Sequence, residues 1–149
     1  MNDTVSARRG AGLRSTALLA WLRLARVFQK VDQASAEYLR RWELSVAQFD
    51  VLAHVGAAEG LTQQELADAL LVTKGNVCQL LNRMERDELI TRVAEGRTNR
   101  LFLTLKGRRL FDEVVPAQEE LIDGLFATLA SEEQVQLLGL LRKVDRALA

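Results

Sequence analysis

The stretch "LTQQELADALLVTKGNVCQLLNRMERDELITR", residues 61–92, holds two short helical patterns separated by only a few residues. The segment "TQQE" at 62–65 has the form of a capping box, which predicts that a helix covers residues 63–70. Apolar residues then recur every three or four positions, which predicts a second helix that Thr73 caps and that ends near Asp87. Its apolar stripe consists of Val77, Leu80, Leu81 and Met84. Two short helices joined by a tight turn predict a helix-turn-helix.

The opposite face of the second helix carries almost no apolar side chain. A helix that reads a DNA groove needs small residues for close approach, amides for base edges and cations for phosphates. Gly75 offers the first, and the amides are Asn76, Gln79 and Asn82. The residues suited to phosphate are Thr73, Lys74, Arg83 and Arg86. Taken alone, each of these side chains could equally be an ordinary solvated residue, so the hypothesis depends on their combination.

The helix-turn-helix is followed by a predicted hairpin. The segments "LITRVA" and "RLFLTL" are rich in strand-forming residues, and "EGRTN" between them has the composition of a turn. A ribbon after a helix-turn-helix makes a winged helix, in which the second helix enters the major groove. Arg97 and Arg100 near the tip could then reach a minor groove, whose negative potential favours cations. The alternative is that both are ordinary surface charges.

The rest of the chain is predicted to be helical, so the fold class is mainly α with a small β-hairpin. A long first helix should run over residues 16–40, and the capping box "SVAQ" at 45–48 should open a helix that ends near Ala58. Thr104 should start a fifth helix, which Pro116 should kink or interrupt because proline lacks the backbone donor. The box "SEEQ" at 131–134 should open the last helix.

Composition excludes several classes of protein. One cysteine and one histidine allow neither an internal disulfide nor a convincing metal site, and a single cysteine suits the reducing cytoplasm. No run of residues is apolar enough to cross a membrane. The chain has a net charge of zero, but residues 72–109 hold nine basic and four acidic side chains, whereas residues 110–149 hold three and eight. A compact basic segment is typical of an anion-binding face, although a solvated charged surface is an equal alternative.

Residues 61–110, "LTQQELADALLVTKGNVCQLLNRMERDELITR…GRTNRLFLTLKGRRL", resemble the MarR family of bacterial transcription regulators. The proline in "VVPAQEEL" and the "LT-x-KG" segment at 103–107 also match. Counting back from that segment, the family's "D-x-R" wing motif falls on Glu95-Gly96-Arg97, which makes Arg97 the first candidate for the minor groove and Arg100 the second. Two positions depart from the pattern, because Leu71 and Glu88 stand where the family usually has glycine. The first wing strand is also expected to be about three residues short.

The resemblance implies a homodimer that binds double-stranded DNA at a short, AT-leaning pseudo-palindrome and acts as a repressor. The length of the chain predicts a single domain, residues 1–149, and its polar, basic N-terminus predicts a flexible tail at 1–14. Residues 15–44 and 110–149 would form the dimer, and residues 45–109 would be the DNA-binding lobe.

Members of the family commonly bind small aromatic or phenolic anions in a cleft between the dimer helices and the lobe. The candidates for such a site in this chain are Trp21, Arg23, Trp42, Phe49 and His54. The alternative is that Trp21 and Phe49 pack in the core or the dimer interface and that His54 is a partly buried helix residue. Another branch of the family senses oxidants through a cysteine in its first helix, which is cysteine-free here. Cys78 in the second helix of the motif is a candidate redox site, and the simpler interpretation is a small side chain on the groove side.

The sequence holds no nucleophile–base pair, phosphate loop or paired acidic site, so we expect no enzyme and no cofactor. The main alternative to a DNA-binding regulator is a winged-helix module whose basic face binds an acidic protein.

Overall fold

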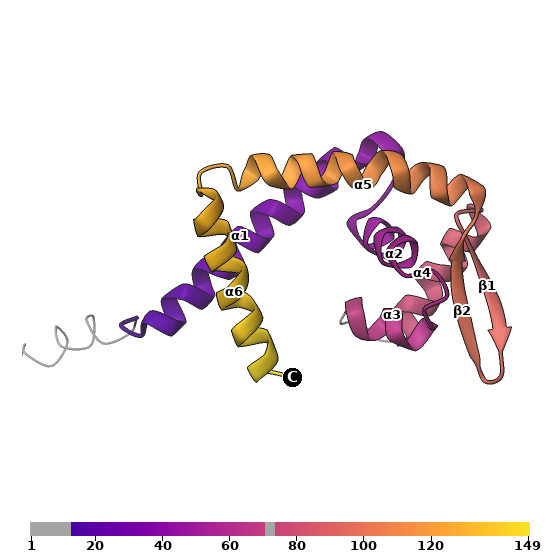
Figure 1. The fold of residues 1–149 in the computed structure, drawn as a ribbon, viewed down its shortest axis with the longest axis horizontal. Coiled ribbons are helices and arrows are strands. Elements are labelled where there is room, and N and C mark those ends of the chain that lie inside the picture. Colours follow the sequence, from indigo (N-terminus) through magenta and orange to yellow (C-terminus); the bar gives the residue numbers. More distant parts are fainter. Residues whose placement is uncertain (1–12, 71–73) are drawn as a thin grey trace, which may run out of the picture.

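The computed structural model describes residues 13–70 and 74–149, where it contains six α-helices, a short 3-10 helix and a two-stranded hairpin (Figure 1). In chain order these are α1 (Thr16–Leu39), η1 (Arg40–Trp42), α2 (Val46–Ala57), α3 (Gln63–Leu70), α4 (Lys74–Arg86), β1 (Ile90–Glu95), β2 (Thr98–Leu103), α5 (Leu105–Leu125) and α6 (Ser131–Ala147). The predicted fold class, mainly α with a β-hairpin wing, is therefore confirmed. The predicted Thr73 cap and residues 1–12 of the predicted tail lie outside the described residues.

Three helices begin at caps that the sequence predicts. The Ser45 hydroxyl accepts from the Gln48 amide at 3.1 Å, and the Gln48 side chain accepts from the Ser45 amide at 2.9 Å, which completes a capping box. The Thr62 hydroxyl accepts from the Glu65 amide at 3.1 Å. The Thr104 hydroxyl accepts from the Gly107 amide at 2.9 Å. These bonds satisfy backbone donors that have no partner within the helix, so each fixes a helix start.

Two local predictions need correction. The N-cap of the last helix lies one position earlier than predicted, at Ala130 instead of Ser131, and Glu133 accepts from the Ala130 amide at 2.9 Å. Gln134, the expected partner of Ser131, instead donates to the carbonyl of Phe126. The second concerns Pro116, which was predicted to kink or interrupt the fifth helix and does not interrupt α5. Its side chain is exposed, so the carbonyl one turn earlier that loses its donor lies on a face open to water.

The hairpin is regular along its whole length. Its antiparallel register runs from Ile90 opposite Leu103 to Glu95 opposite Thr98, so both strands have six residues and a two-residue turn joins them. Gly96 in that turn has a φ of +62°, which glycine adopts without strain. Leu101 of β2 also exchanges backbone hydrogen bonds with the segment between α2 and α3, which fixes the base of the hairpin to the helices.

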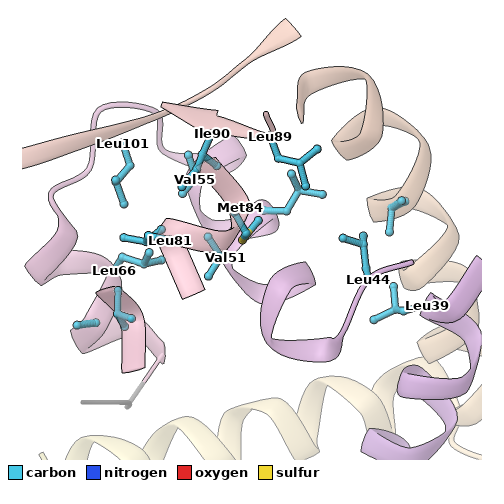
Figure 2. Close-up of a cluster of buried hydrophobic side chains, with 14 residues drawn as sticks. Leu39, Leu44, Val51, Val55, Leu66, Leu81, Met84, Leu89, Ile90 and Leu101 are labelled. Carbon is cyan, nitrogen blue, oxygen red and sulfur yellow. The ribbon is translucent and has the colours of Figure 1, made fainter. Parts of the chain in front are cut away.

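The buried side chains form one cluster, drawn in Figure 2, that extends from Leu39 to Val114. We call residues 39–114 the lobe. Its fourteen buried apolar residues come from each α-helix and strand between the end of α1 and the first half of α5, and from the connecting segments that hold Leu44 and Leu89. Figure 2 shows Val51, Val55, Leu66, Leu81 and Met84 pointing toward one another from α2, α3 and α4. This packing holds α4 and the hairpin in fixed positions relative to each other.

Two helical segments extend away from the lobe on the same side of the molecule (Figure 1). We call residues 16–34 of α1 and the whole of α6 the arms. Every residue of the arms is at least partly exposed, including Trp21 at 62%, Phe28 at 67% and Val135 at 71%. Within the described ranges, no helix combines the length and the apolar character that crossing a bilayer requires.

Candidate nucleic-acid interface

α4 has one face fixed in the lobe and one face open. Val77, Leu81 and Met84 are fully buried and Leu80 is half-buried, as the stripe in the sequence predicts. The opposite face is exposed and holds the predicted DNA contacts Gly75, Asn76, Gln79, Asn82 and Arg83. A Cβ added at Gly75 would meet nothing within 4 Å, so the packing of this chain does not itself require a glycine there. Of the other candidates, Lys74 is the first residue of α4, and Thr73 lies outside the described residues.

The side of α4 that faces α2 is hollowed. A cavity of about 540 Å³ brings Asn76, Gln79 and Arg83 together with Asp50 of α2. Burial raises the pKa of Asp50, the charge of His54 acts in the opposite direction, and Asp32 raises it further. Four residues predicted to contact DNA therefore line one open concavity, namely Asn76, Gln79, Arg83 and Arg86, together with apolar side chains of α2, α3 and α4.

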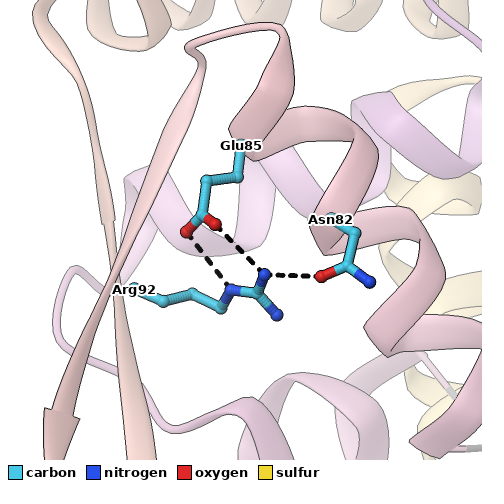
Figure 3. A network of polar contacts seen from close by, with 3 residues as sticks. All are labelled: Asn82, Glu85 and Arg92. Carbon is cyan, nitrogen blue, oxygen red and sulfur yellow. Dashed lines mark hydrogen bonds and ion pairs between the residues drawn. The ribbon is translucent and has the colours of Figure 1, made fainter.

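The other side of α4 is linked to the wing by Arg92 of β1 (Figure 3). Its guanidinium contacts both carboxylate oxygens of Glu85 at 3.2 and 3.3 Å and donates to Asn82 Oδ1 at 2.5 Å. The hydrogen bond from Arg92 is the main cause that lowers the pKa of Glu85, and the Glu85 carboxylate raises the pKa of Arg92, with a further contribution from Cys78.

Arg92 and Glu85 were not predicted as site residues from the sequence. The signal available was an arginine inside a strand pattern, seven positions after a glutamate on a helix. That spacing alone does not show that the two side chains meet across a turn.

The two arginines of the wing have different surroundings. Arg97 lies in the two-residue turn at the tip and is exposed. Arg100 donates to the Gly60 carbonyl, between α2 and α3, at 2.8 Å, and it forms an ion pair with Glu95 of β1. The Arg97 side chain is therefore available at the tip, whereas Arg100 connects the wing to the loop after α2.

The cavity beside Trp42 is lined by none of the other four candidate ligand residues. Trp21 and Arg23 are exposed on the arm of α1, and Phe49 packs against the buried core. His54 is exposed, so the expectation of a partly buried residue is wrong; its Nδ1 lies 2.7 Å from the Asp50 carbonyl oxygen. Trp42 is half-buried, donates to Glu113 at 3.1 Å and packs edge-on against Tyr38.

Trp42 does line a cavity of about 550 Å³ between η1 and the start of α2, the end of α4, and the first half of α5. Its apolar lining consists of Trp42, Leu44, Leu89 and Leu110. Its charged lining consists of the cations Arg83, Lys106 and Arg109 and the carboxylates Glu43, Asp87 and Glu113. Arg83 thus borders this cavity as well as the concavity on the α2 side of α4. An aromatic wall with several cations can hold an aromatic anion.

Cys78 is a half-buried free thiol on the wing side of α4, next to Arg92. In the part of the chain that the structure describes, no three histidine, cysteine, aspartate or glutamate side chains group in a way that could hold a metal ion.

Comparison with known proteins gives the same family at the levels of sequence and fold. A model of the MarR family matches residues 42–100, which cover the helix-turn-helix and most of the wing. An HTH-type transcriptional regulator of Bacillus cereus is 36% identical over 129 residues, which are 86% of this chain and 88% of that protein.

Two solved structures with bound DNA have a similar fold. The Staphylococcus aureus MepR–DNA complex has a TM-score of 0.78 at 26% identity and covers 92% of this chain and 100% of its own. A mutant of Escherichia coli MarR with operator DNA has a TM-score of 0.79 at 26% identity and covers 90% and 99%. With a relative above one-third identity over most of both chains, this protein belongs to the MarR family of winged helix-turn-helix transcription regulators.

Proposed function

We propose that this regulator binds double-stranded DNA in a sequence-specific manner, with α4 in the major groove and the wing tip at a neighbouring minor groove. The observation that carries the proposal is the division of α4 into a face fully buried in the lobe and an exposed face of amides, glycine and arginine. Buried Val77, Leu81 and Met84 hold the helix rigidly, so its open face can keep one geometry on the DNA. The DNA-bound structures of MepR and MarR support this proposal.

The roles of the side chains follow from their chemistry and position. Gln79 and Asn76 carry both donor and acceptor groups that can pair with base edges. Gly75 lets the helix approach closely, because the space beyond its missing Cβ is open. Thr73, Lys74 and Arg83 would contact phosphates, which position the helix without reading sequence.

At the wing, Arg97 is the residue we assign to the minor groove, since it is exposed at the tip of the hairpin. Arg100, which the sequence analysis ranked second, instead fixes the orientation of the wing through Gly60 and Glu95. The wing is thus held in a fixed orientation and carries one exposed arginine, Arg97, at its tip.

We also propose that the protein is a homodimer formed through the arms. Twelve large apolar side chains of the arms are exposed, a larger patch than soluble monomers normally leave open to water. They are Leu18, Leu19, Trp21, Leu22, Leu24, Val27 and Phe28 of α1 and Val135, Leu138, Leu140, Leu141 and Val144 of α6. A second copy presents the same stripes, and two-fold pairing would place two lobes on a pseudo-palindromic site.

An effector site is the last part of the proposal. The cavity next to Trp42 suits a small aromatic anion, and Arg83 links that cavity to the DNA-binding face. A ligand that engages Arg83 removes a phosphate contact, so it should bind the DNA-free protein more tightly and lower DNA affinity. This would make the protein a ligand-responsive repressor acting in the cytoplasm.

The test is a fluorescence polarisation titration on the DNA upstream of its own gene and on shuffled DNA of the same composition. Tight binding to the first alone, with a steep loss as salt rises, is expected. Equal affinity for both would favour the alternative, a winged-helix module that binds an acidic protein. Repeating the titration with benzoate tests the effector, since the native protein should lose affinity and the Arg109→Gln variant should lose less.

Two substitutions distinguish contacts that only position the protein on DNA from contacts that recognise a base. Arg97→Ala should weaken binding to all sequences about equally, because it removes a cation from the minor groove. Gln79→Ala should instead reduce discrimination at one base position of each half-site by about 1–3 kcal/mol. Unchanged affinity and site preference in Gln79→Ala would refute the assignment of base reading to this residue.

A further inference from the structure

Cys78, Asn82 and Glu85 form a row along the side of α4 that faces the wing. They are spaced four and three residues apart, so they lie one above another on the helix surface. Arg92 of β1 interacts with all three of them, most strongly with Glu85. Figure 3 shows its guanidinium between Glu85 and Asn82, on the way from the strand to the helix. One side chain of the wing therefore reaches the DNA-binding helix at a residue predicted to read bases.

The contact fixes which way the Asn82 amide faces. Arg92 can only donate hydrogen bonds, because a guanidinium has no acceptor. The atom of Asn82 that faces it must therefore be Oδ1, at 2.5 Å, and the amide nitrogen must point the other way. In Figure 3 the nitrogen of Asn82 is the end turned away from Arg92. A hydrogen bond from a charged donor is among the stronger kinds, so this orientation is held firmly.

Glu85 in turn holds Arg92 in place. The two carboxylate oxygens bind Nε and the terminal nitrogen at 3.3 and 3.2 Å, a fork that fixes the plane of the guanidinium. The Arg92 side chain is only 18% exposed, and its charge already has a partner in Glu85. Arg92 is therefore poorly placed to contact a phosphate, and its remaining role is to donate a hydrogen bond to Asn82.

From this geometry, and building on the DNA binding proposed above, we propose that Arg92 is a specificity-determining positioning residue: it holds Oδ1 of Asn82 toward the wing and leaves the amide N–H groups as the part of Asn82 that meets a base. The familiar pairing of asparagine with adenine needs the amide to accept from N6 and donate to N7 at the same time. With Oδ1 held by Arg92, Asn82 instead presents donors to the acceptors of the major groove. These are O6 and N7 of guanine, O4 of thymine and N7 of adenine. Adenine also places its N6 donor beside N7, and an Oδ1 turned toward Arg92 cannot accept from that donor, so Asn82 favours guanine or thymine over adenine.

The experiment compares base preferences of the full-length protein by selection from a pool of half-sites randomised around the native sequence. Asn82→Ala identifies the position that Asn82 contacts, because the preference there is lost. Arg92→Leu frees Oδ1, so the affinity for adenine at that position should rise relative to guanine or thymine by about tenfold. In the Asn82→Ala background, Arg92→Leu should leave that position unchanged.

The matched control is Arg108→Leu, which also removes an ion-paired arginine of the lobe but lies next to Glu59, away from α4. It should leave the preference at the Asn82 position unaltered. If Arg92→Leu does not fold, Glu85→Gln takes its place, since it weakens the fork that holds Arg92 and should shift the preference in the same direction.

Three results would overturn the proposal. The first is adenine as the base preferred by the native protein at the Asn82 position. The second is an unchanged preference in the folded Arg92 or Glu85 variant. The third is an equal effect of Arg92→Leu with and without Asn82. These three results apply when the native protein prefers particular half-sites in the pool. If the native protein shows no preference for any half-site, the proposed sequence-specific DNA binding is refuted, and this inference with it.

Discussion

The lobe and the arms carry the same kind of sequence pattern, but their apolar side chains differ in burial in the folded chain. Both have apolar residues at intervals of three and four positions. In the lobe these side chains are buried, as with Leu52 and Leu81 at 0% exposure. In the arms they remain in contact with water, as with Phe28 at 67% and Val144 at 57%. Helical periodicity thus identifies the face of a helix that will be covered, but the covering surface can belong to another molecule.

This difference has consequences for how the two regions work. The lobe is stabilised by its own packing, so α4 and the wing form one solid unit with a fixed spacing. The arms gain their stability from whatever covers them, and in the proposed dimer they set the distance between two such units. A change in the lobe should therefore act on folding, and a change in the arms should act on assembly.

The largest effect is expected from a cavity in the lobe. Leu52→Ala removes most of a fully buried side chain of α2 and should lower the free energy of unfolding by about 2–5 kcal/mol. Urea denaturation followed by circular dichroism measures it. The oligomeric state at low temperature, where the variant stays folded, should match that of the native protein. Dissociation of the folded variant would mean that the lobe and the arms are not separate in function.

A charge in the arms should give the converse result. Leu141→Glu places a carboxylate on the apolar stripe of α6, where burial in a dimer would cost several kcal/mol. Sedimentation velocity should show a weakening of dimerisation by about 100-fold or more. Gln136→Glu, which puts the same charge on the opposite side of α6, is the control and should dimerise normally. A monomeric native protein, or a Leu141→Glu variant that dimerises like the native one, would contradict the assignment of the arms.

The outcome of sequence reasoning differs between the two regions for physical reasons. Capping at Ser45, Thr62 and Thr104 was predictable, because each depends on bonds within four residues. The start of α6 was predicted one residue too late. Ser131 has the right chemistry for a cap, but the chain enters the helix at Ala130, and Gln134 bonds back to Phe126 instead. The pairing of Arg92 with Asn82 could not be predicted, because it depends on how a helix and a strand pack.

The candidate ligand site was also hard to predict from the sequence, because it depends on tertiary packing. The residue types were chosen for their chemistry, but only tertiary packing decides which of them meet. Trp42 reaches a cavity, whereas His54 lies exposed on α2. The exposed face of α4 was more predictable, because a single helix determines which of its residues share a face.

The junction between the wing and α5 should respond more weakly than the lobe core. A Cβ at Gly107 would lie 2.0 Å from the Leu89 carbonyl oxygen, so the backbone just before β1 is in contact with the first turn of α5. Gly107→Ala should force them apart and destabilise the protein by about 1–3 kcal/mol. A matched substitution is Gly139→Ala on α6, where a Cβ meets nothing within 4 Å. A thermal melt in which both variants behave alike would contradict the close contact.

The smallest effect, and a favourable one, is expected at Glu88. This residue ends α4 with a φ of +60°, a left-handed conformation that costs a non-glycine residue about 1–2 kcal/mol. The Leu89 amide donates to the Met84 carbonyl and the Glu88 amide to the Glu85 carbonyl, both at 3.0 Å. That pair of bonds defines a Schellman motif, whose left-handed position usually holds glycine.

Glu88→Gly should relieve the strain but also give the unfolded chain more freedom, so the net gain should be about 0.5–1 kcal/mol in urea denaturation. Glu88→Ala loses the same carboxylate but keeps the Cβ, and it should give no such gain. Because the bonds of the motif lie between α4 and β1, the gain should appear in the lobe and leave the dimerisation constant unchanged. If Glu88→Ala stabilised the protein as much as Glu88→Gly, the backbone conformation would not be the cause, and the glutamate charge would be.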